Sequence, residues 1–191
     1  RHLATNQTLY QVDQIGIGLG DTTVRLRHQV VPQGEWLPAL GWFVLTDLPT
    51  GKRSRGLGNG ELDVGFGTLA EWQTRRWYGF LNLGYFITGG HTDLAPFLYN
   101  DYLSYVVGAA YRLSRTLAIH TQLQGGTPQL HGMGNIQWDD APLDVLVGLS
   151  GTYPDLYGGD TVYWQLGFSE DLHPNGPSID FTAHAQVGIR W

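Results

Sequence analysis

The sequence has no cysteine, few charged residues and no long apolar run. The absence of cysteine excludes disulfides, thiol nucleophiles and Cys-ligated metal centres. Charged residues make up 15% of the 191 residues, below the roughly 25% of an ordinary soluble domain. The longest nearly apolar run, residues 36–45, contains proline and glycine and is too short for a membrane-spanning helix. Because acidic residues outnumber basic ones, 17 to 11, we expect no nucleic-acid partner.

Glycine and aromatic residues are abundant instead. The sequence has 27 glycines, roughly twice the usual share of about 7%, and seven tryptophans. Apolar residues make up 42% of the chain, although so few charges are available to keep a surface in water. A sheet that presents its apolar face to something other than water would explain this composition.

Side chains alternate between apolar and polar along most of the sequence. The last segment shows this most clearly, since every second residue from Phe181 to Trp191 is apolar and those between are polar or glycine. A period of two predicts strands. We predict ten, over approximately 8–20, 22–31, 36–48, 61–72, 76–88, 101–113, 115–125, 143–152, 161–170 and 179–191. No linker or change of composition divides the chain, so we expect one domain over residues 1–191.

The connections between the predicted strands alternate between long and short. Long loops follow the third, fifth, seventh and ninth strands, whereas short turns follow the second, fourth and sixth. This asymmetry is typical of outer-membrane barrels, which have long extracellular loops and short periplasmic turns. We therefore predict an all-β protein, a transmembrane antiparallel up-and-down β-barrel of about ten strands (range roughly 8–12) in the bacterial outer membrane. An even strand number would place both termini on the periplasmic side.

Four tryptophans fall within a residue or two of the short-turn ends: Trp36, Trp72, Trp77 and Trp191. An indole ring is apolar but carries one N–H group, so it is stable at the level of lipid headgroups. A soluble β-sandwich with tryptophan in its core does not explain this clustering. The four residues are therefore predicted to form an aromatic girdle at the periplasmic rim.

The polar side of the strands would line the lumen of such a barrel. Opposite charges there favour a lumen filled by ion pairs and hydrogen bonds, whereas glycine at seven inward positions would leave room for a small solute; both readings stay open. The candidate lumen residues are Arg25, Arg27, Asp63, Glu71, Arg76, Asn82, Arg112, His120, Gln122, Gln124, Asp144, Gln165, Asp180, His184 and Arg190.

The long loops contain further polar candidates. Lys52, Arg53 and Arg55 are candidate contacts to lipopolysaccharide phosphates. His91, His131 and His173 are weak candidates for a divalent metal, because no metal-ligand spacing such as HExxH is present. We expect no metal, no cofactor and no catalytic residue.

Three segments resemble a known family. GIGLGDTTVRLRHQV (16–30), ALGWFVLTDLPTG (39–51) and GLGNGELDVGFG (56–67) resemble a motif series of proteobacterial outer-membrane barrels, found in the meta-pathway phenol-degradation group and in a related group of unknown function. The ending LGFSEDLHPNGPSIDFTAHAQVGIRW is more similar to the latter group, and its last residues resemble the signal read by the barrel insertion machinery. The resemblance implies an outer-membrane barrel and uptake of small apolar molecules. Members of the second group are typically longer, so we expect native N-terminal residues to be missing here.

Three functions are therefore expected, in decreasing order of preference. The first is a passive channel or uptake barrel for small, apolar or aromatic molecules. The second is a structural barrel that anchors an envelope protein assembly. The third is an outer-membrane enzyme, and we expect this protein not to be one. The expected partners are outer-membrane lipid and lipopolysaccharide, the insertion machinery and an envelope protein.

Overall fold

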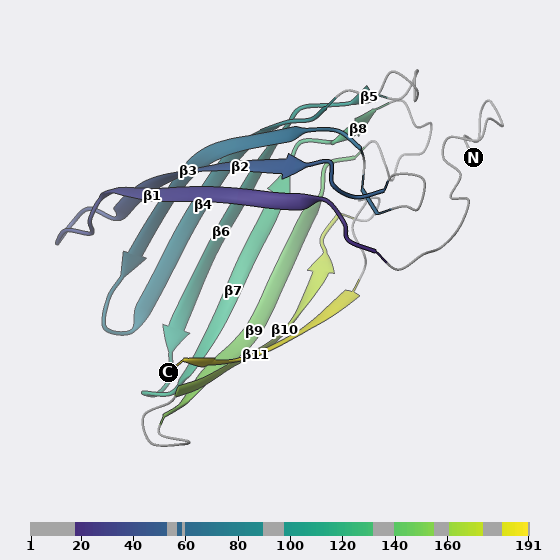
Figure 1. Ribbon diagram of the computed structural model, residues 1–191. Helices are drawn as coiled ribbons and strands as arrows, with labels where there is room; N and C mark the ends of the chain where they lie inside the picture. Colours follow the sequence, from purple (N-terminus) through teal and green to yellow (C-terminus); the bar gives the residue numbers. More distant parts are fainter. Residues whose placement is uncertain are drawn as a thin grey trace.

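The computed structural model describes residues 18–52, 57–58, 60–89, 98–131, 140–154, 161–173 and 181–190. Nine strands in these ranges form one antiparallel sheet whose order follows the chain (Figure 1). They are β1 (Thr22–Val31), β2 (Ala39–Leu48), β3 (Asp63–Gln73), β4 (Trp77–Ile87), β6 (Tyr102–Arg112), β7 (Leu117–Gly126), β9 (Leu143–Pro154), β10 (Thr161–Asp171) and β11 (Phe181–Arg190). The described residues contain no helix, and hence none that could cross a membrane.

The strand predictions for these nine segments are confirmed to within about three residues at each end. The tenth predicted strand, 8–20, lies outside the described residues except for Gly18–Gly20, which are not in a strand. Two short strands were not predicted: β5 (Leu98–Tyr99) and β8 (Leu130–His131) pair with each other in a separate sheet. They join two of the long loops, and two residues are too few to show an alternating pattern.

The connections divide between the two rims as the sequence predicts. Residues 32–38, 74–76, 113–116 and 155–160 link strands at one end of the sheet, which we call the short-turn rim. Residues 49–62, 88–101, 127–142 and 172–180 link them at the other end, the long-loop rim. In the first long loop Gly60 has a φ of 79°, a left-handed conformation that favours glycine.

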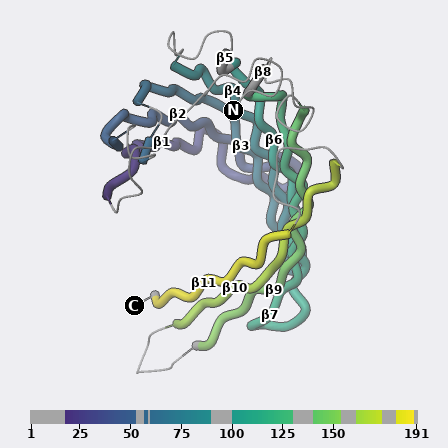
Figure 2. Tube along the Cα trace, turned by 90° about the vertical axis from the view of Figure 1, so that its right-hand side faces the viewer, coloured from purple at the N-terminus to yellow at the C-terminus, as the bar shows by residue number. Residues whose placement is uncertain are grey.

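The sheet is strongly curved. Figure 2 shows the strands along an arc, with β1 and β11 at its two ends. These two edge strands do not pair with each other in the part of the chain that the structure describes. A closed ring therefore stays a prediction, and the observed architecture is an open, nine-stranded up-and-down sheet.

The two faces of the sheet differ in composition, since most charged and amide side chains of the strands lie on one of them. Strand pairing places Arg27, Phe43, Gly67, Gly84 and Ser104 side by side on one face, which we call the polar face. Leucine, valine and aromatic side chains occupy the other, the apolar face, and many are more than one third exposed. Leu45, 7% exposed, is the single buried hydrophobic residue in the described ranges. The sheet therefore has no second layer there to cover its apolar face.

Candidate functional site on the polar face

The strand register places most of the predicted lumen residues on the polar face. These are Arg25, Arg27, Asp63, Glu71, Asn82, Arg112, His120, Gln122, Gln124, Asp144, Gln165 and His184. Arg190 follows the same alternation and is opposite Thr161. Asp180 lies outside the described residues, and Arg76 belongs to a short turn rather than to a strand.

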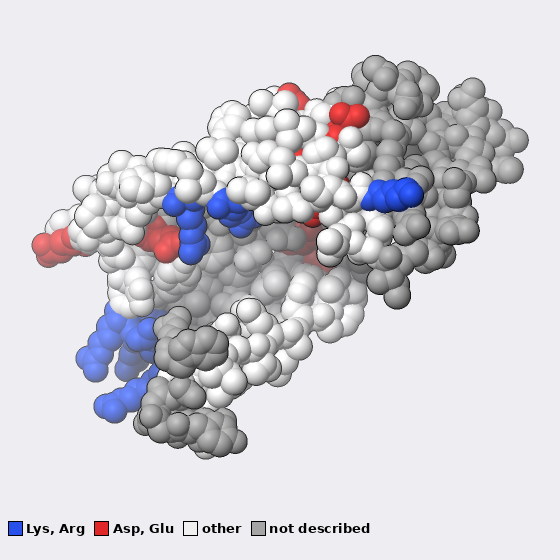
Figure 3. All heavy atoms as spheres, viewed as in Figure 1, with Lys and Arg blue, Asp and Glu red and all other residues white. Residues whose placement is uncertain are grey.

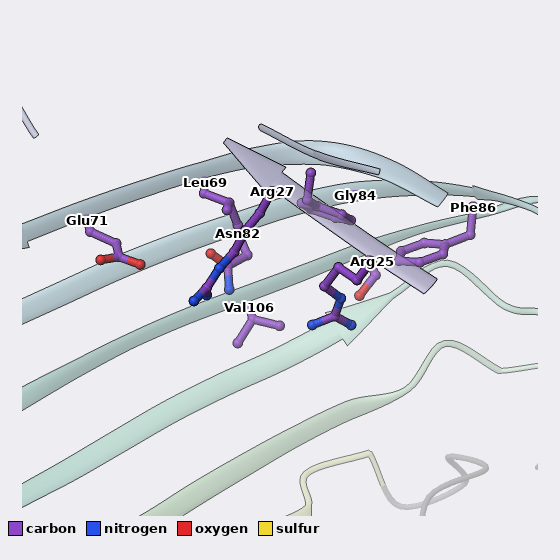
Figure 4. Close-up of a pocket in the computed structure, with 10 residues that line it drawn as sticks. Arg25, Arg27, Leu69, Glu71, Asn82, Gly84, Phe86 and Val106 are labelled. Atoms are coloured by element: carbon purple, nitrogen blue, oxygen red, sulfur yellow. The ribbon is translucent and has the colours of Figure 1, made fainter. Parts of the chain in front are cut away.

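The largest cavity described on this face lies over β1 to β6 and measures about 540 Å³. Its walls combine rings, aliphatic side chains and polar groups (Figure 4): Arg25, Arg27, Phe43, Leu69, Glu71, Asn82, Gly84, Phe86, Ser104 and Val106. This volume lies within the range of roughly 300–1,000 Å³ that is usual for small-ligand sites. The cavity is therefore large enough for a small organic molecule.

Arg25 and Arg27 extend from edge strand β1 into this cavity (Figure 4). Both side chains are exposed, and neither makes a hydrogen bond or an ion pair with any residue that the structure describes. Asn82, from β4, lines the same cavity (Figure 4). Two guanidinium groups with free donors next to Phe43 and Phe86 can hold a polar group while its apolar part contacts the rings.

The other half of the polar face is filled by hydrogen bonds. The Gln165 amide lies 3.0 Å from Nε2 of His120, although β7 and β10 are separated by β9. The bond passes over Gly148, where an added Cβ would meet Nε2 of His120 at 2.6 Å. Nearby, the Gln122 amide donates to Gln124, whose own amide donates to Asp144. The predicted lumen residues of β7, β9 and β10 therefore bond to one another.

Glycines on the polar face lie under aromatic rings. A Cβ at Gly67 would come within 2.5 Å of the Phe43 ring, and one at Gly84 within 2.9 Å of Phe86. Tyr163 covers Gly188 in the same way. The expectation that these glycines leave lumen volume free is therefore wrong at these positions, because a ring from the neighbouring strand (Gly67, Gly188) or from the same strand (Gly84) occupies the space.

The three segments that carry the family resemblance meet at the long-loop rim. Asp21 accepts a hydrogen bond of 2.8 Å from the backbone N–H of Gly51. The Thr50 hydroxyl donates to the Gly20 carbonyl at 3.1 Å. A Cβ at Gly58 would collide with the Asp21 carboxylate. The Gly-Asp, Pro-Thr-Gly and Gly-Leu-Gly motifs thus form one local structure that joins the starts of β1 and β3 to the end of β2.

The short-turn rim carries tryptophans and arginines. Trp36, Trp72 and Trp77 are 87%, 52% and 58% exposed at this rim, whereas Trp191 lies outside the described residues. Arg76 donates a 3.2 Å hydrogen bond to the Tyr111 hydroxyl, and Tyr111 is on the apolar face. The Arg76 side chain is therefore turned away from the predicted lumen.

Few of the candidate binding residues in the long loops can be placed in contact with another side chain. His173 Nδ1 lies 3.6 Å from Asp140 Oδ2, and this contact joins two long loops. His91, Arg53, Arg55 and the side chain of His131 lie outside the described residues. Lys52 is described and is exposed at the long-loop rim. No group of three or more metal-ligating side chains occurs among the described residues.

Sequence reasoning missed one pair with catalytic chemistry. The Ser169 hydroxyl lies 2.9 Å from Nε2 of His184 on the polar face, in adjacent strands. No carboxylate bonds to His184 in the described ranges, so a Ser–His–acid triad is not assembled there. Ser169 gave no sequence signal, because no catalytic motif surrounds it in the sequence.

Comparisons with known proteins do not assign this chain to a family. A scan against protein-family models and a search of curated proteins both give no match for this chain.

Proposed function

We propose that this chain is an integral outer-membrane β-barrel that lets small molecules pass, and that it is related to the two outer-membrane families described above. The observation that carries the proposal is the contrast between the faces of one sheet. A large apolar face without a covering layer is stable only against lipid or another protein. A polar face on the concave side is what the inside of a membrane barrel requires.

The apolar face has the layered composition that a bilayer favours. Aromatic residues lie near both ends of its strands: Phe66, Tyr85, Tyr105, Phe168 and Phe181 towards the long-loop rim, and Trp42, Trp72, Trp77, Tyr111, Tyr153 and Trp164 towards the short-turn rim. Between these two bands the described face is without charged residues. The strands are 10 to 12 residues long, close to the roughly 9–11 needed for a tilted strand to cross a bilayer.

The topology also supports the proposal. Up-and-down strands with short turns on one rim and long loops on the other are typical of these barrels. The unpaired edges of β1 and β11 leave backbone N–H and C=O groups without ladder partners in the described residues. Such groups are too costly in lipid, so the ring must close in the membrane, through pairing of these edges or through further strands.

Site-directed spin labelling tests the membrane position. The chain has no cysteine, so Leu83→Cys and Asn82→Cys each give one unique label on the same strand. In lipid vesicles we expect the label at 83 to collide with oxygen and the label at 82 with a water-soluble nickel chelate, because the two side chains are on opposite faces. Equal nickel accessibility at both sites would contradict insertion in this orientation.

A swelling assay tests passage of solutes. Vesicles with the protein should swell in isotonic arabinose if the cavity of about 540 Å³ belongs to an open path. Ser104→Trp fills that cavity and should slow the swelling severalfold, whereas Tyr105→Trp on the apolar face should leave it unchanged.

A structural barrel is the second candidate, and the hydrogen bonds from His120 to Gln165 favour it because they bridge the polar face. Vesicles that do not swell, although the spin labels report insertion, would support this second function over the first.

A further inference from the structure

Four arginines gather where two short turns meet. Arg75 and Arg76 belong to the turn between β3 and β4, Arg112 ends β6, and Arg115 belongs to the following turn. The Arg112 side chain donates a 3.2 Å hydrogen bond to the Arg75 carbonyl, and its backbone N–H donates to the Arg76 carbonyl at 2.8 Å. These bonds tie the end of β6 to the turn at 74–76, and Arg115 lines a pocket with Arg112 on the polar side of the same rim.

The cluster has no counter-charge of its own. None of the four guanidinium groups makes an ion pair with a carboxylate in the described ranges. Figure 3 shows a group of basic atoms at the lower left, with acidic atoms above it at the same end of the molecule. Glu35 belongs to the neighbouring turn and forms no ion pair with any of them. Four of the 11 basic residues of the chain are therefore available to an external anion.

The cluster lies directly beside the aromatic band of the apolar face. Arg76 donates to the Tyr111 hydroxyl at 3.2 Å, and the Trp77 ring lies 4.7 Å from the Tyr111 ring, centroid to centroid. Trp72 and Trp77 are both more than half exposed on the same rim. In a bilayer these rings mark the level of the headgroups, and Arg76 extends to that level on the lipid side.

We propose that Arg75 and Arg76 bind the phosphate of an anionic phospholipid headgroup at the short-turn rim, with Trp77 and Tyr111 against its acyl chain and with Arg112 holding their turn in place. This inference rests on the proposed membrane function. Guanidinium groups suit the site because they form paired, charge-assisted hydrogen bonds with phosphate oxygens. Arg76 and its neighbours thereby set the depth of the barrel in the leaflet.

Native mass spectrometry of the folded protein in detergent tests the site. The first bound molecule of short-chain phosphatidylglycerol should have a lower Kd than phosphatidylcholine, whose choline neutralises its phosphate. In Arg75→Gln/Arg76→Gln this Kd should rise roughly 25-fold, since each arginine near an anionic lipid contributes about fivefold. Arg112→Gln, which deletes the hydrogen bond to the Arg75 carbonyl, should raise the Kd by a smaller factor.

The matched control is Arg25→Gln/Arg27→Gln, which removes two arginines from the polar face and should leave the Kd unchanged. An unchanged Kd in both rim variants would overturn the proposal. Displacement of the lipid by millimolar inorganic phosphate would also overturn it, because the site would then take a free anion. The spin labels at residues 82 and 83 report insertion separately, so loss of lipid selectivity in an inserted protein refutes only this inference.

Discussion

The polar and apolar faces belong to the same nine strands but are built on different principles. On the polar face, rings lie over glycines and amides bond across strands, so side chains from neighbouring strands fit one another. On the apolar face, Leu83, Val107 and Leu149 are each at least 40% exposed and contact no second layer of the described chain. One face is therefore specified by contacts within the sheet, and the other by the medium around it.

This contrast determines which interactions can stabilise the sheet. A soluble domain derives most of its stability from an apolar core. Here Leu45 is the one buried hydrophobic residue in the described part, so burial of side chains within the chain contributes little. In the proposed membrane barrel, lipid supplies the apolar environment, and the strand ladder and the polar face supply the specific geometry.

Replacing each of two adjacent valines by arginine should give the largest difference in stability between the two faces. Val107→Arg places a charge in the middle of the apolar face and should destabilise the protein by about 2–4 kcal/mol in vesicles. Val106→Arg introduces the same group next to the cavity on the polar face and should cost much less. Urea unfolding in phospholipid vesicles, followed by tryptophan fluorescence, measures both variants. Equal losses of unfolding free energy in the two variants would contradict the assignment of the apolar face to lipid.

Alanine in place of glycine should show how tightly the polar face is packed at Gly67, compared with the open position Gly79 on the apolar face. Gly67→Ala brings a Cβ into contact with the Phe43 ring and the Leu83 carbonyl, and overpacking of this kind costs about 1–3 kcal/mol. Gly79→Ala is the control on the apolar face, where the nearest atom to the new Cβ is 3.8 Å away. The same urea titration should show a clear loss for residue 67 and almost none for residue 79. A neutral Gly67→Ala would mean that the Phe43 ring does not rest on this glycine.

Removal of one bridging amide should have the smallest effect. Gln165→Leu deletes the bond to His120 and should cost about 0.5–1.5 kcal/mol, the net value of one intramolecular hydrogen bond. Gln186→Leu is the control, because Gln186 faces Gln165 on β11 but makes no hydrogen bond with described side chains. Hydrogen exchange of the β10 amides should increase in the first variant only. The same exchange in both variants would show that the bridge contributes no stability to the polar face.

The strands and their faces could be predicted from the sequence because a period of two is a local property. Nine predicted segments, from 22–31 to 179–191, are confirmed, and alternation alone placed Arg25 and Gln165 on the same face. The register between strands depends on pairs that no single segment contains. The sequence therefore could not show that Phe43 covers Gly67, or that His120 reaches Gln165 over Gly148.

The arginine cluster was missed for a similar reason. Arg76 was assigned to the lumen because alternation was extended into the turn, whereas the register does place Arg112 on the polar face. The turns at 74–76 and 113–116 place basic residues side by side although about 35 residues separate them in the sequence. Two short turns that each carry arginine, on strands predicted to be neighbours, were the available signal.

The order of the strands also determines how the protein can assemble. Each strand of the large sheet pairs only with the strands before and after it in that sheet. Every ladder therefore forms when the two ends of one connecting segment come together. The entropy cost of closing such connections is small and grows slowly with their length. A contact between the edges β1 and β11 would instead bring together residues separated by nearly the whole described chain. Closure of the ring should therefore be the slowest and last step of assembly, after eight hairpin-like pairings have already formed.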